Sequence, residues 1–161
     1  MPIVEALPEH LLLLDNDVFS GLRNESPTAK NKVRDYFNNL GCFPALPSVI
    51  IFETFMGVEA ELKRGKITEA KAEDYKNRIR SVASQYQILS VNDKAAEIAA
   101  YIVISMGDKK IKKYWRDLCI AATALAHGYG VATGNRKDFE LISEHLSKKI
   151  YPFLRLSIWK P

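Results

Sequence analysis

The sequence predicts an α/β fold with a central, mostly parallel sheet covered by helices on both faces. Patterns typical of strands alternate with patterns typical of helices along all 161 residues. The apolar run at 11–14 is too short for a buried helix and suits a strand that is buried on both faces. Because alternating strands and helices favour parallel strands joined by helical crossovers, we expect one domain over residues 1–161.

Composition is that of a globular protein, with 47% hydrophobic and 26% charged residues. The formal net charge of +4 is compatible with a polyanionic partner but does not require one. No apolar run approaches the ~18 residues of a membrane span, so we expect no membrane association. Nothing near residue 1 resembles a signal peptide, and Cys42 and Cys119 suit free thiols, which together favour a cytoplasmic location.

The first half of the chain begins with the strand at 11–14 and a short helix at 18–22. Ser26 and Pro27 are typical of a helix start and Gly41 of a helix end, which predicts a helix between them. A short strand at 43–49 follows, interrupted by two prolines. Helices are then expected at 50–63 and 68–83.

The second half continues the alternation with a strand at 87–91 and a helix capped by Asn92 and Asp93. A lysine-rich connector is expected at 108–113, followed by a helix at 115–126 that ends near two glycines. A strand at 131–133, a helix at 137–148 and a last strand at 153–159 complete the predicted order.

Acidic residues at the ends of these strands are the first candidates for chemistry, because α/β sheets bind ligands beyond the carboxyl ends of their strands. Asp15 directly follows the strand at 11–14, although it also suits a helix N-cap. Glu53 lies among apolar residues on nearly every face of its helix. A carboxylate buried there needs a cation or a polar pocket, unless the helix simply exposes it.

Two further positions follow the same pattern. Asp117 is expected in the first turn of the helix at 115–126, where the helix dipole favours an acid with or without a function. Alanines 121, 122, 124 and 126 would let that helix pack closely on a sheet. Asn135 follows the strand at 131–133, where it either contributes to a site or shapes a turn. Carboxylates that converge on one point repel each other unless a hard divalent cation such as Mg²⁺ or Mn²⁺ neutralises them. Such an ion can also activate water and neutralise the charge of a phosphodiester.

Four blocks of the sequence resemble, in order, the conserved blocks of PIN-domain ribonucleases. They are residues 11–18, 53–57, 117–126 and 133–140, and the last two are the most specific. The similarity is closest to VapC-like toxins of type II toxin-antitoxin systems, and it spans nearly the whole chain.

This resemblance implies a PIN-like α/β/α sandwich with a Mg²⁺-dependent endoribonuclease site, in which Mn²⁺ can substitute. The implied catalytic residues are Asp15, Glu53, Asp117 and Asn135, of which Asp15, Asp117 and Glu53 would hold the metal, supported by Thr133 and Asp138. The chain departs from many relatives at Asp17, where they have asparagine, and at Asn135, where they have an acid. One metal ion is therefore expected, and a second is left open.

The resemblance also implies partners. RNA would be held by basic residues near the site, with Lys113, Arg116, Arg136 and Lys137 as candidates. For any one lysine, an ordinary solvent-exposed charge is the simpler explanation. An antitoxin protein would dock on the helices at 50–63 and 68–83, and a homodimer is expected.

Two alternatives stay open at this point. The Asp15-x-Asp17 pattern after a leucine-rich strand also resembles haloacid-dehalogenase-like phosphatases, but Phe19 stands where that motif has threonine or valine. The other alternative is a non-catalytic PIN-fold module that binds RNA or protein, which would bind no metal at these carboxylates.

Overall fold

The computed structural model describes residues 3–146 and 153–160. A four-stranded sheet has the order β1-β6-β5-β2, formed by β1 Ile3–Glu5, β6 Leu154–Ile158, β5 Gly130–Thr133 and β2 Leu12–Leu14. A shorter pair, β3 Leu46–Pro47 and β4 Ile88–Leu89, is joined to β2 by a bridge between Leu13 and Ala45. All of these pairings are parallel, which confirms the predicted sheet.

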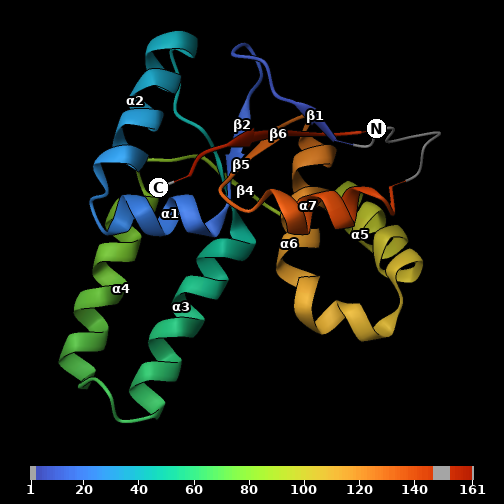
Figure 1. The fold of residues 1–161 in the computed structure, drawn as a ribbon. Helices are drawn as coiled ribbons and strands as arrows, with labels where there is room; N and C mark the ends of the chain where they lie inside the picture. The colour runs from blue at the N-terminus through green and yellow to red at the C-terminus, as the bar shows by residue number, and fades with distance from the viewer. Residues whose placement is uncertain (1–2, 147–152, 161) are drawn as a thin grey trace.

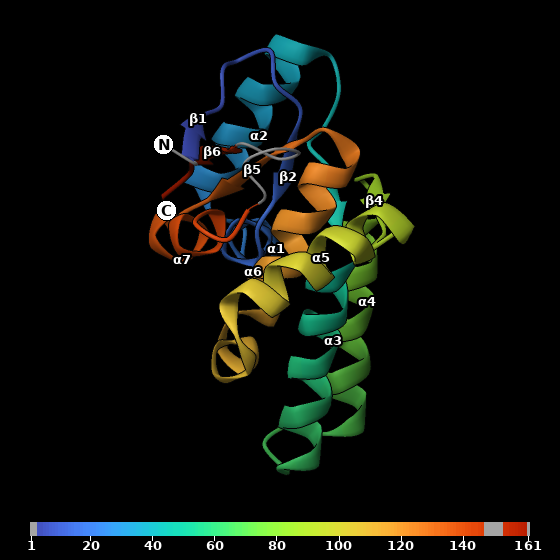
Figure 2. The same ribbon diagram turned by 90° about the vertical axis from the view of Figure 1, so that its right-hand side faces the viewer.

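Seven helices surround the strands in the described part of the chain. They are α1 Asn16–Arg23, α2 Pro27–Leu40, α3 Ser48–Lys63, α4 Glu69–Ala83, α5 Asp93–Met106, α6 Asp108–His127 and α7 Arg136–Ser143. Helices α2 and α6 lie on opposite sides of β2 and β5 (Figures 1 and 2). The α/β/α arrangement expected from the sequence is therefore present.

Local signals correctly located several helix ends. The Ser26 hydroxyl accepts a hydrogen bond from the Ala29 amide, and Gly41 ends α2 in the left-handed conformation that glycine adopts without strain. Thr68 and Asn92 cap α4 and α5 in the same way as Ser26 caps α2.

The connector predicted at 108–113 is wrong, because these residues form the first turns of α6. The break between helices falls at Gly107, whose φ of 84° ends α5. Asp108 then favours a new helix start, since an acid there complements the positive end of the helix dipole. Asp117 consequently lies well inside α6, so the expected stabilisation by the helix N-terminus is absent.

Other boundaries also differ from the prediction. The strand expected at 43–49 is reduced to β3, because α3 already begins at Ser48. Helix α7 ends at Ser143, before the expected end, and residues 147–148 of that prediction lie outside the described residues. Strand β1 was not predicted. It has a mixed pattern of exposure and gains its order from pairing with β6.

One part of the core lies between the sheet and α6. Leu13, Leu14 and Val131 are fully buried on the strands, and Ala121 and Ala122 are fully buried on the helix. Small side chains allow α6 to approach β2 and β5 closely, as the alanine pattern predicted. This close packing holds the middle of α6, including Asp117, beside the strands.

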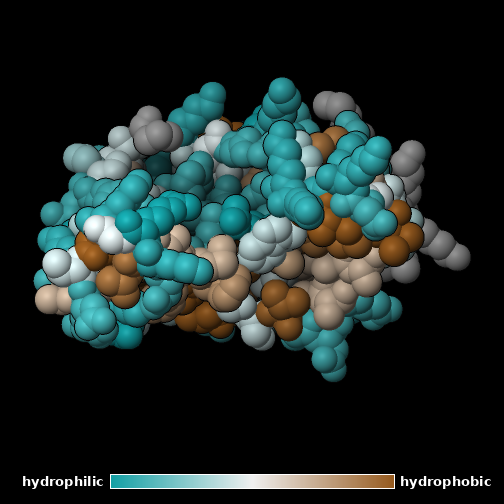
Figure 3. Space-filling view, turned by 90° about the horizontal axis from the view of Figure 1, so that it is seen from below, coloured by the Kyte–Doolittle hydropathy of each residue, from teal (hydrophilic) through white to brown (hydrophobic). Residues whose placement is uncertain are grey.

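Helices α3 and α4 project together beyond the rest of the molecule (Figures 1 and 2). A small separate cluster of Val58, Ala72 and Ile79 packs between them. Seen from below, hydrophobic side chains form separate areas among hydrophilic ones (Figure 3). Within the ranges 3–146 and 153–160, no helix combines the length and apolar character that crossing a membrane requires.

Candidate functional site

The site is built where β2 and β5 end side by side. Leu14 pairs with Ala132, so the next residue of each strand, Asp15 and Thr133, emerges at the same edge of the sheet. The Thr133 hydroxyl donates a hydrogen bond of 2.6 Å to Oδ2 of Asp15, and the Asn16 amide donates one of 2.6 Å to Oδ1. Asp15 is only 7% exposed, so this carboxylate is fixed on both oxygens and held away from water.

Asp117 faces the same point from α6. Burial, followed by the charges of Asp15, Asp138 and Glu53, raises the pKa of Asp117 to about 7, while Arg116 lowers it. Burial raises the pKa of Asp15 to about 6, with repulsion from Asp17 adding to it and the Thr133 hydrogen bond opposing it. The predicted residues Asp15, Glu53 and Asp138 are therefore close enough to Asp117 to act on it electrostatically.

Glu53 lies beside a cation, as expected for a carboxylate among apolar residues. The cation is the guanidinium of Arg116. Oε1 of Glu53 lies 3.5 Å from Nε of Arg116, and the Glu53 side chain is 23% exposed. The Arg116 Nε is itself buried without a hydrogen bond, so the pair is electrostatic and lacks hydrogen-bond geometry. Arg116, which was expected to hold RNA, thus lies against the carboxylate cluster.

Asn135 and Asp138 are joined at the start of α7. The Asn135 side-chain amide donates to Asp138 over 2.6 Å, and its backbone amide donates to the Thr133 hydroxyl over 2.9 Å. Thr133 therefore donates to Asp15 and accepts from Asn135, which links the candidate supporting residues to the buried carboxylate.

A contact between Asp17 and Gly134 was not predicted. The Gly134 amide donates to Oδ2 of Asp17 over 2.7 Å, and a Cβ at position 134 would lie 2.5 Å from that oxygen. Asp17 thereby holds the turn after β5 against the start of α1. The sequence signal was present, since each residue follows a strand, but only the parallel pairing of β2 and β5 brings them together.

The other basic residues expected to bind RNA differ in exposure and in whether they already have an ionic partner. Lys113 and Lys137 are exposed. Arg136 donates to Glu140 of its own helix over 2.6 Å. Lys113 also lies with its ammonium 5.1 Å from the centre of the Tyr114 ring.

The carboxylates do not form a preformed metal-binding site. Within the described residues, no three histidine, cysteine, aspartate or glutamate side chains are grouped closely enough to hold a metal ion. The donors are nevertheless oxygen atoms in a negatively charged, largely buried setting, which is the ligand chemistry of Mg²⁺ and Mn²⁺.

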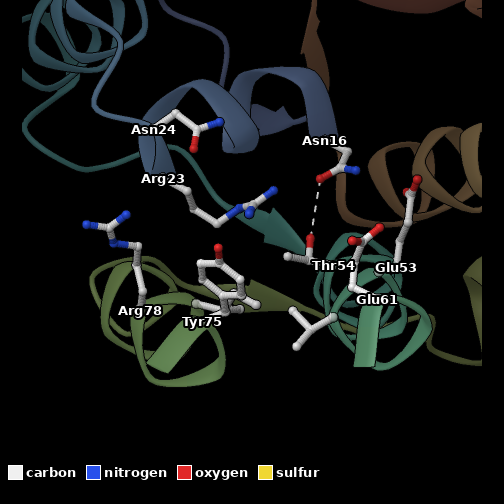
Figure 4. A pocket seen from close by; sticks show the side chains of 11 residues that line it. Asn16, Arg23, Asn24, Glu53, Thr54, Glu61, Tyr75 and Arg78 are labelled. Carbon is white, nitrogen blue, oxygen red and sulfur yellow. Dashed lines mark hydrogen bonds between the residues drawn. The ribbon is translucent and has the colours of Figure 1, made fainter. Parts of the chain in front are cut away.

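A pocket of about 580 Å³ opens beside this cluster, between α1, α3 and α4. Asn16 and Glu53 line the end of the pocket nearest the carboxylate cluster, and the Thr54 hydroxyl donates to the Asn16 side chain over 3.4 Å (Figure 4). Arg23 and Arg78 also line it. No sequence pattern indicated this pocket, because its wall residues are distributed over three helices.

Solved structures share this architecture. A DNA-bound VapBC from Salmonella typhimurium matches with a TM-score of 0.68 and 18% identity, over 94% of this chain and 99% of its own. VapBC2 from Rickettsia felis, bound to a DNA fragment from its promoter, matches with a TM-score of 0.65 and 18% identity over 93% and 99%. VapBC-1 from nontypeable Haemophilus influenzae matches with a TM-score of 0.60 and 16% identity over 92% and 98%.

No protein-family model matches the sequence, and no curated protein matches it. The strand order, the layers and these structural matches together define the class of the molecule, a PIN-like α/β/α fold. A further match, with 22% identity and a TM-score of 0.55, is a toxin-antitoxin complex from Klebsiella pneumoniae. At 16–22% identity these structures carry the fold alone to this chain.

Proposed function

We propose that the protein is a Mg²⁺-dependent endoribonuclease and the toxin of a toxin-antitoxin pair. The observation that carries this proposal is the meeting of Asp15 and Asp117, two largely buried carboxylates with raised pKa values, at the carboxyl ends of β2 and β5. Burial of like charges at one point is unfavourable for folding, and such arrangements are typical of functional sites. The PIN-like fold supports the same conclusion.

Asp15, Asp117 and Glu53 would hold Mg²⁺, or Mn²⁺ in its place. Their oxygen donors and mutual repulsion suit a hard divalent cation, although the side chains must turn inwards to share one ion. When bound, the ion would activate water and neutralise charge on a phosphodiester.

The chain's own residues prepare the site for this chemistry. Thr133 orients the Asp15 carboxylate through the 2.6 Å hydrogen bond. Arg116 holds Glu53 beside Asp117 and offsets part of the negative charge. Asn135 and Asp138 fix the start of α7 next to this edge, and the exposed Lys113 and Lys137 would contact the RNA backbone.

Cleavage of a labelled, mixed-sequence RNA by the purified protein tests the proposal. We expect cleavage in MgCl₂, none with excess EDTA, and a loss of about 100-fold or more in Asp117→Asn. Asp35→Asn, an exposed change on α2, is the matched control and should cleave like the wild type. Equal cleavage by Asp117→Asn and the wild type would refute the site.

A protein partner is proposed on separate grounds. An apolar pocket of about 370 Å³ between α3 and α4 is lined by Ile51, Phe55, Ile79 and Ala83, among others. Two large hydrophobic side chains of α3, Phe52 and Met56, are also exposed. These surfaces and the toxin-antitoxin complexes that share the fold support an antitoxin that docks on α3 and α4; the homodimer stays a prediction. Co-purification of a small protein expressed from the adjacent reading frame tests the antitoxin.

A further inference from the structure

We propose that the pocket between α1, α3 and α4 is a nucleotide subsite, which holds the RNA phosphate and base next to the scissile bond. The proposal rests on the ribonuclease function and adds the residues that position the substrate. A volume of about 580 Å³ falls within the range of small-molecule sites and has room for a nucleotide.

The walls of the pocket differ in charge from one end to the other. Arg78 and Tyr75 lie at one end, Arg23 lies in the middle, and Glu53 lies at the end nearest the catalytic carboxylates (Figure 4). An RNA chain with its scissile phosphate at the carboxylate cluster and its backbone running along the pocket would therefore bring a further phosphate to the arginines.

The two arginines are not neutralised by the protein. Among the described residues, neither Arg23 nor Arg78 forms an ion pair. Nε of Arg23 is buried without a hydrogen-bond partner, and its guanidinium stacks 5.1 Å from the centre of the Phe19 ring. Because Nε itself is closed to solvent, a phosphate in the pocket would be bound by the terminal N–H groups of the guanidinium, for which a phosphate oxygen is a well-suited acceptor.

The acidic residues of the pocket have cations of their own. Glu61 lies 4.0 Å from Arg64, and Glu53 lies 3.5 Å from Arg116. Their charge therefore opposes an incoming phosphate less than unpaired glutamates would.

Tyr75 adds a surface for a base. The residue is 38% exposed, and the Lys71 ammonium lies 5.1 Å from the ring centre, which adds another positive charge near the pocket. Aromatic rings beside arginines are the usual means of holding single-stranded nucleic acid without strict sequence preference. Arginines without an ion-pair partner would bind a phosphate or a carboxylate, but only RNA also supplies a base for the aromatic ring. The pocket therefore favours RNA over an acidic protein segment.

Binding of a fluorescein-labelled RNA dodecamer to Asp117→Asn protein tests the subsite without cleavage. In this background we expect Arg78→Ala and Arg23→Gln each to weaken binding about tenfold. The slope of log affinity against log salt should fall by about 0.7 for each phosphate that a variant no longer binds. Tyr75→Ala should weaken binding, whereas Tyr75→Phe should retain it because the ring remains.

Arg34→Ala, an exposed arginine on α2, is the control for removal of one positive charge. Urea unfolding checks each variant; if Arg23→Gln is unfolded, the exposed Arg78 and Tyr75 variants carry the test. Pocket variants that bind RNA as tightly as Arg34→Ala would overturn the subsite, while Mg²⁺-dependent cleavage by the wild type would leave the proposed function intact.

A second probe separates RNA from a protein partner. A labelled ten-residue glutamate peptide should bind weakly and equally to the pocket variants and to Arg34→Ala. If Arg78→Ala abolished peptide binding and left RNA binding unchanged, the pocket would belong to a protein partner and the proposal would be wrong. A wild type that neither binds nor cleaves RNA would overturn both the subsite and the proposed function.

Discussion

The Thr133 hydroxyl donates to the Asp15 carboxylate over 2.6 Å, although the two residues are 118 positions apart in the sequence. Both side chains are buried at the end of adjacent parallel strands. The bond stabilises the charged form of Asp15 and opposes the rise in pKa that burial causes. Thr133, together with the Asn16 amide on the other oxygen, therefore keeps this carboxylate oriented and ionisable.

We expect Thr133→Val to lower the free energy of unfolding by about 1–3 kcal/mol, because a buried carboxylate loses a donor. The loss should be larger at pH 8 than at pH 4, since only the ionised carboxylate depends on the bond. Urea unfolding at both pH values measures it. Thr123→Val, which removes a 2.7 Å hydrogen bond to the Cys119 carbonyl within α6, is the control. If the loss in the free energy of unfolding depended on pH in the same way in both variants, Thr133 would not act through the ionised form of Asp15.

Asp117→Asn should stabilise the protein at pH 8 in the absence of divalent cations. The folded pKa of Asp117, about 7, lies above its ordinary value of 3.8, so the folded state binds the proton more tightly. Stability conferred by this group is therefore present at low pH and lost as the pH rises from about 4 to about 7. We expect a gain of roughly 1–3 kcal/mol at pH 8 and almost none at pH 4, measured by urea unfolding. Asp35→Asn, the control, should leave the free energy of unfolding unchanged at both pH values. If Asp117→Asn were less stable than the wild type at pH 8, the proposed repulsion between Asp117 and its acidic neighbours would be wrong.

Arg116→Ala should raise the pKa of Asp117 further, because the guanidinium lowers it in the wild type. Carboxyl carbon chemical shifts followed by NMR during a pH titration measure this value directly. Arg116→Lys should preserve most of the effect, since it retains a positive charge. Arg64→Ala, which removes a pairing with Glu61, is the control. An unchanged Asp117 titration in Arg116→Ala would show that Arg116 acts elsewhere.

Gly134→Ala should destabilise the protein by about 1–3 kcal/mol, because the added Cβ meets the Asp17 carboxylate at 2.5 Å. The cost should shrink in an Asp17→Ala background, where the clash is removed. A double-mutant cycle in urea measures the coupling, which we expect to be about 1 kcal/mol or more. Gly57→Ala meets no atom within 4 Å and should be neutral or stabilising. Additive effects at positions 17 and 134 would contradict the contact.

Mg²⁺ should raise the thermal unfolding midpoint of the wild type by several degrees at pH 8. Binding to the folded state alone contributes about 2.7 kcal/mol at a hundredfold excess over the dissociation constant. EDTA should reverse the shift, and an equal ionic strength of NaCl should not reproduce it. Asp117→Asn should respond little, because it lacks one of the proposed ligands. A full Mg²⁺ response in Asp117→Asn would place the metal at another position.

Much of the fold follows from local sequence. The start and end of α2 depend on Ser26 and Gly41, whose effects act within a few residues. The strand identity of β2 follows from its apolar run. The predicted start of α6 is wrong, because a lysine-rich segment suits both a solvated loop and an exposed helix. The helix break lies at Gly107, so the lysines that follow it are helical. Strand β1 has no local signal, since its order comes from pairing with β6.

The sequence by itself determined the alternation of strands and helices and identified Asp15, Glu53 and Asp117 as candidates, because strand ends and block motifs are local properties. Only the tertiary structure decided that Asp17 holds Gly134, that Arg116 faces Glu53, and that arginines of α1 and α4 share one pocket. These contacts depend on the register of β2 against β5 and on how the helices pack. Such contacts bring together residues with no local influence on one another, and so no pattern within a short window of sequence specifies them.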